Sequence, residues 1–509
     1  MPVSENFVSA IEKGYACSGD HIVIGRALLT GQVVPADVKL PLAMLNRHGL
    51  IAGATGTGKT KTLQMLSEQL SDNSVPVLLM DIKGDLSGIA AMGVAGERTL
   101  NRYQQLGMTY TPASFPVELL TLSDQPGVRL RATVSEFGPV LLSKILGLND
   151  TQGGVVAIIF KYCDDNKMPL LDLQDLIKVL QYVGDEGKEE IEKLYGKIST
   201  TSTGTILRKV IELQQQGADQ FFGEKSFEVE DLMRISSDGR GVINVLRVTD
   251  MQDRPKLFST FMLQLLAELY ASSPEEGDLD RPKLILFVDE AHLIFNEASD
   301  ALLDQLEMVI KLIRSKGIGI IFCTQNPQDV PAPILSQLGL KIQHALRAFT
   351  AADRKTIKQA AENFPVTDFY QTDELITQLG IGEALVTLLN EKGIPTPLVH
   401  TLLCTPRSRM DVLTDQEIAA LVGSSKLVAK YAGEINSDSA YEILTRKLEA
   451  AAAPVEDDKP AGGRAPKEES IFDNPVVREV GKTAATIITR SLLGALGLGG
   501  RSSRRKSLF

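Results

Sequence analysis

The sequence has few cysteines and histidines for its length. Its four cysteines, Cys17, Cys163, Cys323 and Cys404, are far apart among 509 residues, form no CxxC pair, and are accompanied by five histidines. A structural zinc site needs four such ligands that converge, and a disulfide framework needs densely spaced cysteines. We therefore expect neither a structural zinc site nor a set of disulfides, but buried thiols in a reducing compartment.

The chain also lacks the apolar segments that membrane insertion and secretion require. Its N-terminus, MPVSENFVSAIEKGYAC, has no cationic segment followed by an apolar stretch, and no uninterrupted apolar run of about eighteen residues occurs anywhere. These absences predict a cytoplasmic protein without a signal peptide or a transmembrane segment.

An excess of basic residues is missing as well. Lysine and arginine number 53 against 64 acidic residues, which gives a formal net charge of −11. Such a balance argues against a protein that coats nucleic acid over its whole surface, although it leaves room for a basic pore or loop.

The order of apolar segments predicts an α/β fold. Strands are expected at 50–52, 75–80, 242–248, 284–288 and 318–324, and amphipathic or buried helices at 59–70, 258–270 and 301–315. Strands that alternate with helices in this way form a mostly parallel sheet. Segments 384–389 and 397–404, joined by a turn-rich stretch, predict a hairpin at the edge of that sheet.

Composition divides the chain further. Residues 140–215 carry apolar residues at helical spacing, whereas residues from about 450 onward are rich in Ala, Pro, Gly and charge and cannot build a core. The predicted parts are a short β-rich segment (1–46), an α/β core in two pieces (47–135 and 240–430), a mainly helical insertion (136–239), a terminal helix (431–449), a flexible linker (450–470) and a basic tail (471–509) that includes a short helix at 475–493.

The strongest motif is a phosphate-binding loop. Residues 53–60 read GATGTGKT, which matches GxxxxGK[ST], and they follow an apolar strand and open a helix as this motif requires. Backbone N–H groups of such a loop surround phosphate oxygens at a helix N-terminus. The predicted nucleotide-binding residues are Gly53, Ala54, Thr55, Gly56, Thr57, Gly58, Lys59, Thr60 and Lys61. Among them, Lys59 should reach the β- and γ-phosphates, and the Thr60 hydroxyl should ligate Mg²⁺.

A second motif supplies two acids. The apolar strand 284–288 ends in Asp289 and Glu290, and ligands of open α/β sheets bind at the carboxyl ends of strands. Asp289 is predicted to hold the Mg²⁺ shell, and Glu290 to orient and deprotonate the attacking water. Gln325, which follows the next strand, could sense the γ-phosphate or position the water, and Asn326 beside it is a weaker candidate.

The second predicted strand also ends in polar residues, Asp81, Lys83 and Gly84. Asp81-x-x-Gly84 fits a GTPase switch element, but the one candidate guanine-reading segment, residues 166–169 (NKMP), lacks the necessary aspartate. A GTPase would also not need the Asp289–Glu290 pair. ATP is therefore the favoured nucleotide.

Together, GATGTGKT, MDIKGDL, FVDEAHLIF and the strand leading into CTQNPQD resemble the HerA/FtsK superfamily of P-loop ATPases, and most closely the bacterial HerA-like proteins of the YjgR type. The resemblance covers about residues 20–430. It implies a RecA-like fold, ATPase activity and a hexameric ring with nucleotide between subunits and nucleic acid through the centre. HerA proper carries an N-terminal β-barrel of about a hundred residues. Only 52 residues precede Gly53 here, so at most a truncated barrel fits, and the docking of HerA's partners is not carried over.

The resemblance assigns roles residue by residue. Lys59 and Thr60 match the Walker A lysine and hydroxyl, Asp289 and Glu290 match the Walker B pair, and Gln325 matches the polar residue after the next strand. Asp81, Lys83 and Gly84 match an element of the second strand. A ring motor also implies an arginine supplied by the neighbouring subunit. The candidates are Arg314, which we favour because it ends a helix just before the Gln325 strand, Arg347 and Arg354.

Two functions remain open at this stage. The first is a HerA-like DNA helicase or translocase, a homo-oligomer that moves or remodels nucleic acid. The second is an ATPase switch or remodeller that acts on a protein partner through the basic tail, where seven lysines and arginines face two acids. No helix-turn-helix, zinc finger or aromatic and basic stripe favours DNA directly. A catalytically dead ATP-binder is disfavoured because the catalytic side chains are all present.

Overall fold

The computed structural model describes residues 3–252, 254–277, 279–295, 300–431 and 438–452. Its chain forms two compact units, each assembled from two separate stretches of sequence. The first unit comprises Met1–Leu130 and Phe227–Gly433, and the second comprises Arg131–Ser226 and Glu434–Phe509.

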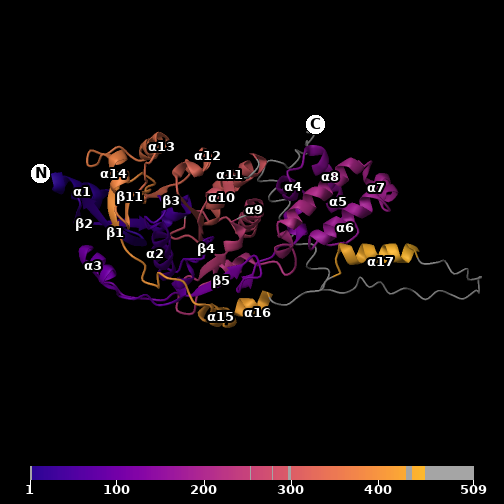
Figure 1. Ribbon diagram of the computed structural model, residues 1–509, viewed down its shortest axis with the longest axis horizontal. Helices are drawn as coiled ribbons and strands as arrows, with labels where there is room; N and C mark the ends of the chain where they lie inside the picture. Colours follow the sequence, from indigo (N-terminus) through magenta and orange to yellow (C-terminus); the bar gives the residue numbers. More distant parts are fainter. Residues whose placement is uncertain (1–2, 253, 278, 296–299, 432–437, 453–509) are drawn as a thin grey trace, which may run out of the picture. The chain divides into compact units, whose positions relative to one another are not determined.

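The first unit is built on one twelve-stranded sheet with the order β2-β1-β12-β11-β10-β3-β9-β8-β4-β7-β5-β6. Figure 1 labels six of these strands, β1 to β5 and β11. The strands are β1 (His21–Leu29), β2 (Gln32–Pro41), β3 (Gly49–Ala52), β4 (Val77–Asp81), β5 (Val117–Thr121), β6 (Val128–Arg129), β7 (Ile243–Arg247), β8 (Leu284–Val288), β9 (Ile318–Thr324), β10 (Leu340–Gln343), β11 (Glu383–Thr387) and β12 (Val399–Leu403).

Every pair from β10 across to β6 is parallel, whereas β10, β11, β12, β1 and β2 pair antiparallel. All residues of β4, β8 and β9 are buried. Near-continuous apolar strands are what a parallel sheet covered on both faces requires. The prediction of an α/β fold with a mostly parallel sheet is confirmed.

Helices cover both faces of this sheet for a topological reason. The chain moves from β3 to β4 in one direction along the sheet and from β8 to β9 in the other. Since such crossovers are right-handed, α2 (Lys59–Asp72) and α11 (Asp300–Ile313) lie on opposite faces. Alternate residues of the strands, such as Leu79 and Phe287, join α2 in one core cluster.

The remaining helices of the first unit are α1 (Val3–Gly14), α3 (Glu97–Gln105), α9 (Pro255–Ser272), α10 (His292–Phe295), α12 (Ala332–Leu335), α13 (Ala351–Glu362), α14 (Thr372–Gln378), α15 (Asp415–Gly423) and α16 (Lys426–Tyr431). Helix α9 packs on α10 and α11. Most of its described side chains are buried, as expected of a helix beneath neighbours.

The N-terminal segment contains two strands, as expected of a β-rich segment, but it also contains a helix, and its strands extend the main sheet. It begins with helix α1, and its two strands form a hairpin that turns at Thr30 and Gly31, both with positive φ. Strand β1 then pairs with β12 and extends the main sheet. The predicted hairpin exists as β11 and β12, but the edge position was wrong, because β1 and β2 occupy that edge.

The second unit is helical: α4 (Val134–Ile145), α5 (Asp150–Asp165), α6 (Leu173–Gly184), α7 (Lys188–Tyr195), α8 (Thr200–Gln215) and α17 (Ala440–Ala452). Capping boxes at Thr133, Asn149 and Asp172 begin the first three, because each side chain satisfies free N–H groups of the first turn.

The predicted boundaries of the accessory parts differ in detail from these elements. Within 136–239, α-helix ends at Gln215 and only short 3₁₀ turns follow before β7. Of the helix expected at 431–449, residues 440–449 lie in α17 of the second unit, Tyr431 ends α16, and residues 432–437 lie outside the described residues. The predicted linker from residue 453 on and the basic tail with its helix lie outside the described residues.

All four cysteines are free thiols, and Cys17 and Cys404 are only half-buried rather than buried as expected. None of the helices in the described part of the chain combines the length and apolar character that a bilayer span requires.

Candidate functional site

The predicted phosphate loop connects the carboxyl end of β3 to the start of α2, in the middle of the sheet. Gly53, Gly56 and Gly58 adopt positive φ values of 155°, 79° and 110°, a region that favours glycine. A Cβ on Gly53 would lie 2.5 Å from the Cβ of His344. The sequence needs glycine there both for the turn and for this close approach.

Neighbouring strands hold the loop in place. The Gly53 N–H donates to Thr324 O at 3.2 Å, and the Ala54 N–H donates to Ala345 O at 2.8 Å. Thr324 ends β9 and Ala345 follows β10, and these two strands flank β3. The loop is therefore fixed by both neighbours at the N-terminus of α2, where phosphate binds in such loops.

Lys59 is buried, with 5% of its surface exposed. Its ammonium donates to Gly53 O at 2.6 Å and to Ala54 O at 3.2 Å. Burial lowers the pKa of Lys59, and the nearby Lys83 adds to this, while the carboxylates of Glu290 and Asp289 oppose it. That coupling shows that Lys59 and the two acids share one electrostatic environment.

The remaining loop residues lie around this lysine. The Thr57 hydroxyl donates to Ala54 O at 2.7 Å, and Thr60 is half-buried in the first turn of α2. Lys61 points away from the loop and donates to Met410 O at 2.6 Å. The Lys61 side chain therefore lies among protein groups, so any contact of this residue with nucleotide falls to its backbone.

The acid pair follows β8, two strands from β3. Because β3, β9 and β8 are parallel, Gly53 and Asp289 leave the same edge of the sheet, about 10 Å apart at the usual strand spacing. Asp289 is 2% exposed, and its Oδ2 has no hydrogen-bond partner among the described residues. Burial raises the pKa of Asp289 and the nearby Lys83 opposes that rise.

Glu290 is held in an unusual backbone conformation. Its φ of 46° lies in the left-handed region that non-glycine residues rarely adopt. The residue is buried, and its Oε1 forms an ion pair with Lys83. Its Oε2 lies 3.2 Å from His292 Nδ1. Burial would raise the pKa of Glu290, but the ion pair with Lys83 outweighs burial and the pKa is lowered.

Asp81 shapes the loop that carries Lys83. Its carboxylate accepts hydrogen bonds from the N–H groups of Gly84, Asp85 and Leu86 at 2.7, 3.1 and 3.2 Å. Burial raises its pKa to about 6 despite these donors. Asp81 thus folds the turn after β4, and the part of this element that reaches the acid pair is Lys83.

Gln325 and Asn326 follow β9 at the same edge, and both side chains are exposed. Asp329 organises this turn, because its carboxylate accepts from the Asn326 N–H at 3.0 Å and from the Thr324 hydroxyl. Gln325 is thus placed next to the site but is not held against it by the described residues.

The three candidate arginines do not all lie at the end of the sheet that carries the phosphate loop. Arg314 precedes β9, so it is at the edge opposite to the phosphate loop of its own chain. Arg347 follows β10 at the loop edge and donates to Thr377 O at 2.8 Å, and Arg354 is exposed on α13. A role for Arg314 in hydrolysis therefore requires a second copy of the chain.

Sequence reasoning missed two residues that support the phosphate loop. His344 is fully buried behind it, with its Nε2 3.0 Å from the Thr62 hydroxyl, and burial lowers its pKa to about 4. Arg102 donates to Ile381 O and Gly382 O, both at 2.9 Å, and the Gly382 N–H donates to Thr57 O at 3.2 Å. His344 follows β10 as Gln325 follows β9, so the strand-end signal could have identified it, whereas Arg102 carries no local signal.

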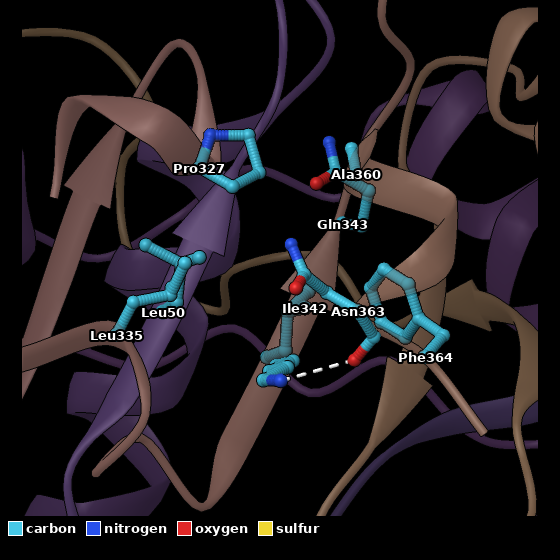
Figure 2. A pocket seen from close by; sticks show the side chains of 9 residues that line it. Leu50, Pro327, Leu335, Ile342, Gln343, Ala360, Asn363 and Phe364 are labelled. Atoms are coloured by element: carbon cyan, nitrogen blue, oxygen red, sulfur yellow. Dashed lines mark hydrogen bonds between the residues drawn. The ribbon is translucent and has the colours of Figure 1, made fainter. Parts of the chain in front are cut away.

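A separate apolar pocket lies against β3 and β10, beside α12 and α13 (Figure 2). Its lining residues are Leu50, Pro327, Leu335, Lys341, Ile342, Gln343, Ala360, Asn363 and Phe364. None of them is a predicted site residue, and Lys341 is engaged with Asn363 O at 3.0 Å. The pocket is therefore distinct from the predicted phosphate site.

Comparison with known proteins identifies the family. The model of the helicase HerA-like C-terminal family matches residues 27–469. The chain belongs to this family. The HerA-like chain is 22% identical over 355 residues to the DNA double-strand break repair helicase HerA of Saccharolobus solfataricus, an alignment that covers 69% of this chain and 63% of that protein.

A second relative is the DNA import protein CedB of Sulfolobus acidocaldarius. It is 22% identical over 411 residues, which cover 78% of the HerA-like chain and 59% of CedB. The chain thus spans less than two thirds of the length of these relatives.

Solved structures agree on the fold. The bacterial conjugative coupling protein TrwB, in a trigonal form with sulphate, superposes with a TM-score of 0.51 at 14% identity, over 80% of this chain and 94% of that one. TrwB in complex with ADP and Mg²⁺ superposes with a TM-score of 0.50 at 15% identity, over 79% and 100%. The resemblance to HerA/FtsK-type P-loop ATPases and the RecA-like fold are confirmed, while the finer YjgR-type assignment stays a prediction.

Proposed function

We propose that this HerA-like chain is a magnesium-dependent ATPase that couples hydrolysis to the movement or remodelling of DNA. The observation that carries the proposal is the meeting of the glycine loop, Lys59 and the Asp289–Glu290 pair at one edge of a parallel sheet. Two stretches more than two hundred residues apart supply these groups, and the resulting set is the one that phosphoryl transfer needs.

The donor set fits Mg²⁺. This ion takes oxygen ligands and is usually held by one or two protein oxygens together with phosphate oxygens and water. Asp289 offers a buried carboxylate oxygen with no partner among the described residues, and Thr60 offers a hydroxyl in the first turn of α2. These two residues would hold the ion, which when bound supplies neutralisation of phosphate charge.

The chain's own groups then have distinct tasks. N–H groups of the loop that are not bonded to neighbouring backbone and the ammonium of Lys59 bind the β- and γ-phosphates. Gln325, which follows β9 at the same end of the sheet, contacts the γ-phosphate or the water. Glu290 accepts the proton of the attacking water, because it is the deprotonated, buried carboxylate beside the metal residue. Exclusion of bulk water by the buried pair strengthens each of these interactions.

ATP is the proposed nucleotide. TrwB has been solved with a non-hydrolysable ATP analogue and with ADP and Mg²⁺, but also with a GTP analogue, so the neighbours leave the choice of base open. The sequence offers no guanine-reading aspartate. Hydrolysis of ATP and GTP should therefore be compared directly, with and without Mg²⁺.

The decisive variant is Glu290→Gln, which keeps the size of the side chain and removes the base. We expect its ATPase rate to fall by about 100-fold or more, with binding of ATP retained. Glu362→Gln, an exposed change at the end of α13, is the matched control and should hydrolyse ATP at the wild-type rate. An unchanged rate in Glu290→Gln would refute the assignment of the base.

The DNA part of the proposal rests on the relatives, whose names include a DNA repair helicase and a DNA import protein. The ATPase rate should rise when single- or double-stranded DNA is added, and the rise should weaken with salt because phosphate contacts release counterions. Indifference to DNA, combined with capture of a protein that depends on residues 471–509, would instead establish the protein-remodelling alternative.

Assembly into a homo-oligomeric ring is part of the same proposal, with six subunits by family resemblance. Arg314 lies at the sheet edge opposite to its own phosphate loop, so it can act only on a neighbour's nucleotide. Measurement of the mass in solution, in the buffer used for the ATPase assay, tests this directly. A monomer that hydrolyses ATP at the full rate would remove both the ring and the role of Arg314.

A further inference from the structure

The ion pair between Lys83 and Glu290 is not explained by the roles assigned so far. Lys83 belongs neither to the phosphate loop nor to the acid pair, but to the turn after β4, the strand next to β8. Its side chain is 36% exposed, whereas that of Glu290 is 8% exposed. An ordinary surface ion pair contributes little, but this one has a buried partner at the edge where the site lies.

The turn that carries Lys83 is fixed on both sides. Asp81 accepts three backbone N–H groups from residues 84–86, and the Gln252 side chain donates to Ile82 O at 2.7 Å. Gly84 has a φ of 76°, with Thr249 Cγ2 only 3.0 Å from where a Cβ would be. The Lys83 backbone is therefore held by its turn, which leaves only the torsions of its side chain to be fixed by the ion pair.

The two oxygens of Glu290 differ in their surroundings. Oε1 is engaged by Lys83, whereas Oε2 is buried and has no hydrogen-bond partner among the described residues. His292 Nδ1 lies 3.2 Å from Oε2, and Lys59 and Asp289 are the other charged groups that face the pair. One oxygen is thus tethered and the other remains available to accept a proton.

We propose that Lys83 is a positioning residue for hydrolysis: it anchors Glu290 through Oε1 and thereby presents Oε2 to the attacking water. The inference rests on the proposed function, because it presupposes that Glu290 is the base. In the step it supports, the water oxygen forms a bond to the γ-phosphorus while the bond to the β,γ-bridging oxygen breaks. The electron pair of that bond leaves with ADP, and the water proton passes to Oε2.

The geometry also explains why a cationic side chain is needed at position 83. Glu290 has a left-handed backbone; its Oε1 is held by Lys83, and its Oε2 lies 3.2 Å from His292 Nδ1. Removal of the ammonium would release Oε1 and let the carboxylate rotate. A displacement of about 1 Å in a catalytic group can cost about 100-fold in rate, so the effect should fall on turnover and not on nucleotide binding.

The test compares Lys83→Met and Lys83→Gln with Lys83→Arg. We expect the first two to lower kcat by roughly 10- to 100-fold, and Lys83→Arg to recover most of the loss because it restores a cation that can bind Oε1. The dissociation constants of ADP and of a non-hydrolysable ATP analogue, measured by calorimetry, should stay within about twofold of wild type. Lys355→Met, an exposed change on α13, is the control for loss of a lysine as such.

A double-variant cycle decides whether Lys83 acts through Glu290. In the Glu290→Gln background, Lys83→Met should cause little further loss, because the group that it positions is already disabled. Additive losses would overturn the inference. So would an unchanged kcat in Lys83→Met, or weaker binding of the ATP analogue with unchanged binding of ADP, which would make Lys83 a ligand of the γ-phosphate.

These outcomes are distinguishable from failure of the proposed function. If the wild-type protein does not hydrolyse ATP, or if Glu290→Gln is as active as wild type, the base assignment fails and Lys83 has nothing to position. If Glu290→Gln is inactive and the Lys83 variants behave as wild type, the proposed function stands and only the role of Lys83 is refuted.

Discussion

At the scale of single residues, the charges of the candidate site balance one another. Lys59, Lys83, Asp289 and Glu290 form a cluster with two positive and two negative charges, and each affects the pKa of its neighbours. Burial of an unmatched charge in such a place would be costly. The arrangement leaves one carboxylate oxygen of each acid without a partner among the described residues, and these oxygens are the ones assigned to the metal and the water.

His48 shows how a single buried residue couples the fold to pH. It is 3% exposed, its Nε2 donates to Ile310 O at 2.8 Å, and its Nδ1 accepts the Ile320 N–H at 3.0 Å. A second proton on Nδ1 would break the bond to Ile320. Burial is the main cause that lowers the pKa of His48 to about 4, and the nearby Arg314 adds to it.

We therefore predict a loss of stability in acid that traces to this histidine. The unfolded chain binds the proton near pH 6.5 and the folded chain only near pH 4, so the stabilisation is complete above pH 6.5 and disappears as the pH falls to about 4. The shift corresponds to roughly 3 kcal/mol for this one group.

The free energy of unfolding in urea, measured between pH 7.5 and 4 with a spectroscopic probe in the first unit, tests this prediction. In His48→Asn, which cannot titrate, the free energy of unfolding should depend less steeply on pH in this window, although the variant should be less stable at pH 7.5. Equal slopes in the two proteins would contradict the prediction. His21→Asn, with its ring at an exposed site, serves as the control.

At the scale of elements, the helix that follows the phosphate loop is tied to a segment far away in sequence. Glu68 of α2 is 1% exposed and accepts from the N–H groups of Arg407 and Ser408 at 2.6 and 3.1 Å and from the Ser408 hydroxyl. Gln64 donates to Ser408 and Arg409, one turn earlier. Residues 407–410 therefore lie along α2 and hold it relative to the sheet.

Replacement of Glu68 by Ala should destabilise the protein by roughly 2–4 kcal/mol, because it leaves two buried N–H groups without an acceptor. Glu68→Gln, which keeps an acceptor, should cost less. Chemical denaturation, followed with a spectroscopic probe in the first unit, gives the free energy of unfolding of each variant. Glu362→Ala, a change at an exposed position, is the control. If Glu68→Ala and Glu362→Ala unfold at the same midpoint, the contact with residues 407–410 has no role in stability.

The second unit contains a comparable long-range contact. Asp175 of α6 is 1% exposed and accepts from the Tyr441 N–H at 2.8 Å and from the Ser439 hydroxyl. It also closes the capping box of its own helix with Asp172. One carboxylate therefore caps the start of α6 and also binds the start of α17. The sequence around Asp175 and the sequence around Tyr441 do not predict this pairing.

At the scale of the whole molecule, the proposed motor needs more than one chain. The acidic residues of the proposed hydrolytic site lie at the carboxyl ends of the parallel strands, because Glu290 follows β8. The preferred arginine lies at the opposite, amino ends, because Arg314 precedes β9. A closed ring brings the opposite edges of neighbours together through repetition of one contact. The prediction is that each complete site is shared by two subunits.

Mixing of two inactive variants tests this. Glu290→Gln and Arg314→Ala should each be inactive alone. A 1:1 mixture that has been allowed to reassemble should recover up to about a quarter of wild-type activity. That is the fraction of random subunit contacts in which an intact Glu290 meets an intact Arg314. No recovery in a mixture shown to contain both variants in one assembly would exclude Arg314 as the shared residue. Arg354→Ala mixed with Glu290→Gln is the comparison.

The sequence by itself determined the residues of the candidate phosphate site and the class of fold. The glycine loop and the strand that ends in Asp289 and Glu290 are local patterns, because strand, turn and helix propensities are set within a few residues. The parallel core followed from the same patterns, since apolar strands alternating with helices have few other ways to bury both faces.

Only the tertiary structure decided which distant groups meet. Three contacts join segments that are far apart in sequence: the pairing of β1 with β12, the support of the loop by Arg102 and His344, and the engagement of Glu290 by Lys83. Such contacts depend on the order of strands across the sheet, which is fixed when the whole hydrophobic core closes. A pattern read a few residues at a time carries no information on that order, so these contacts could not be predicted from it.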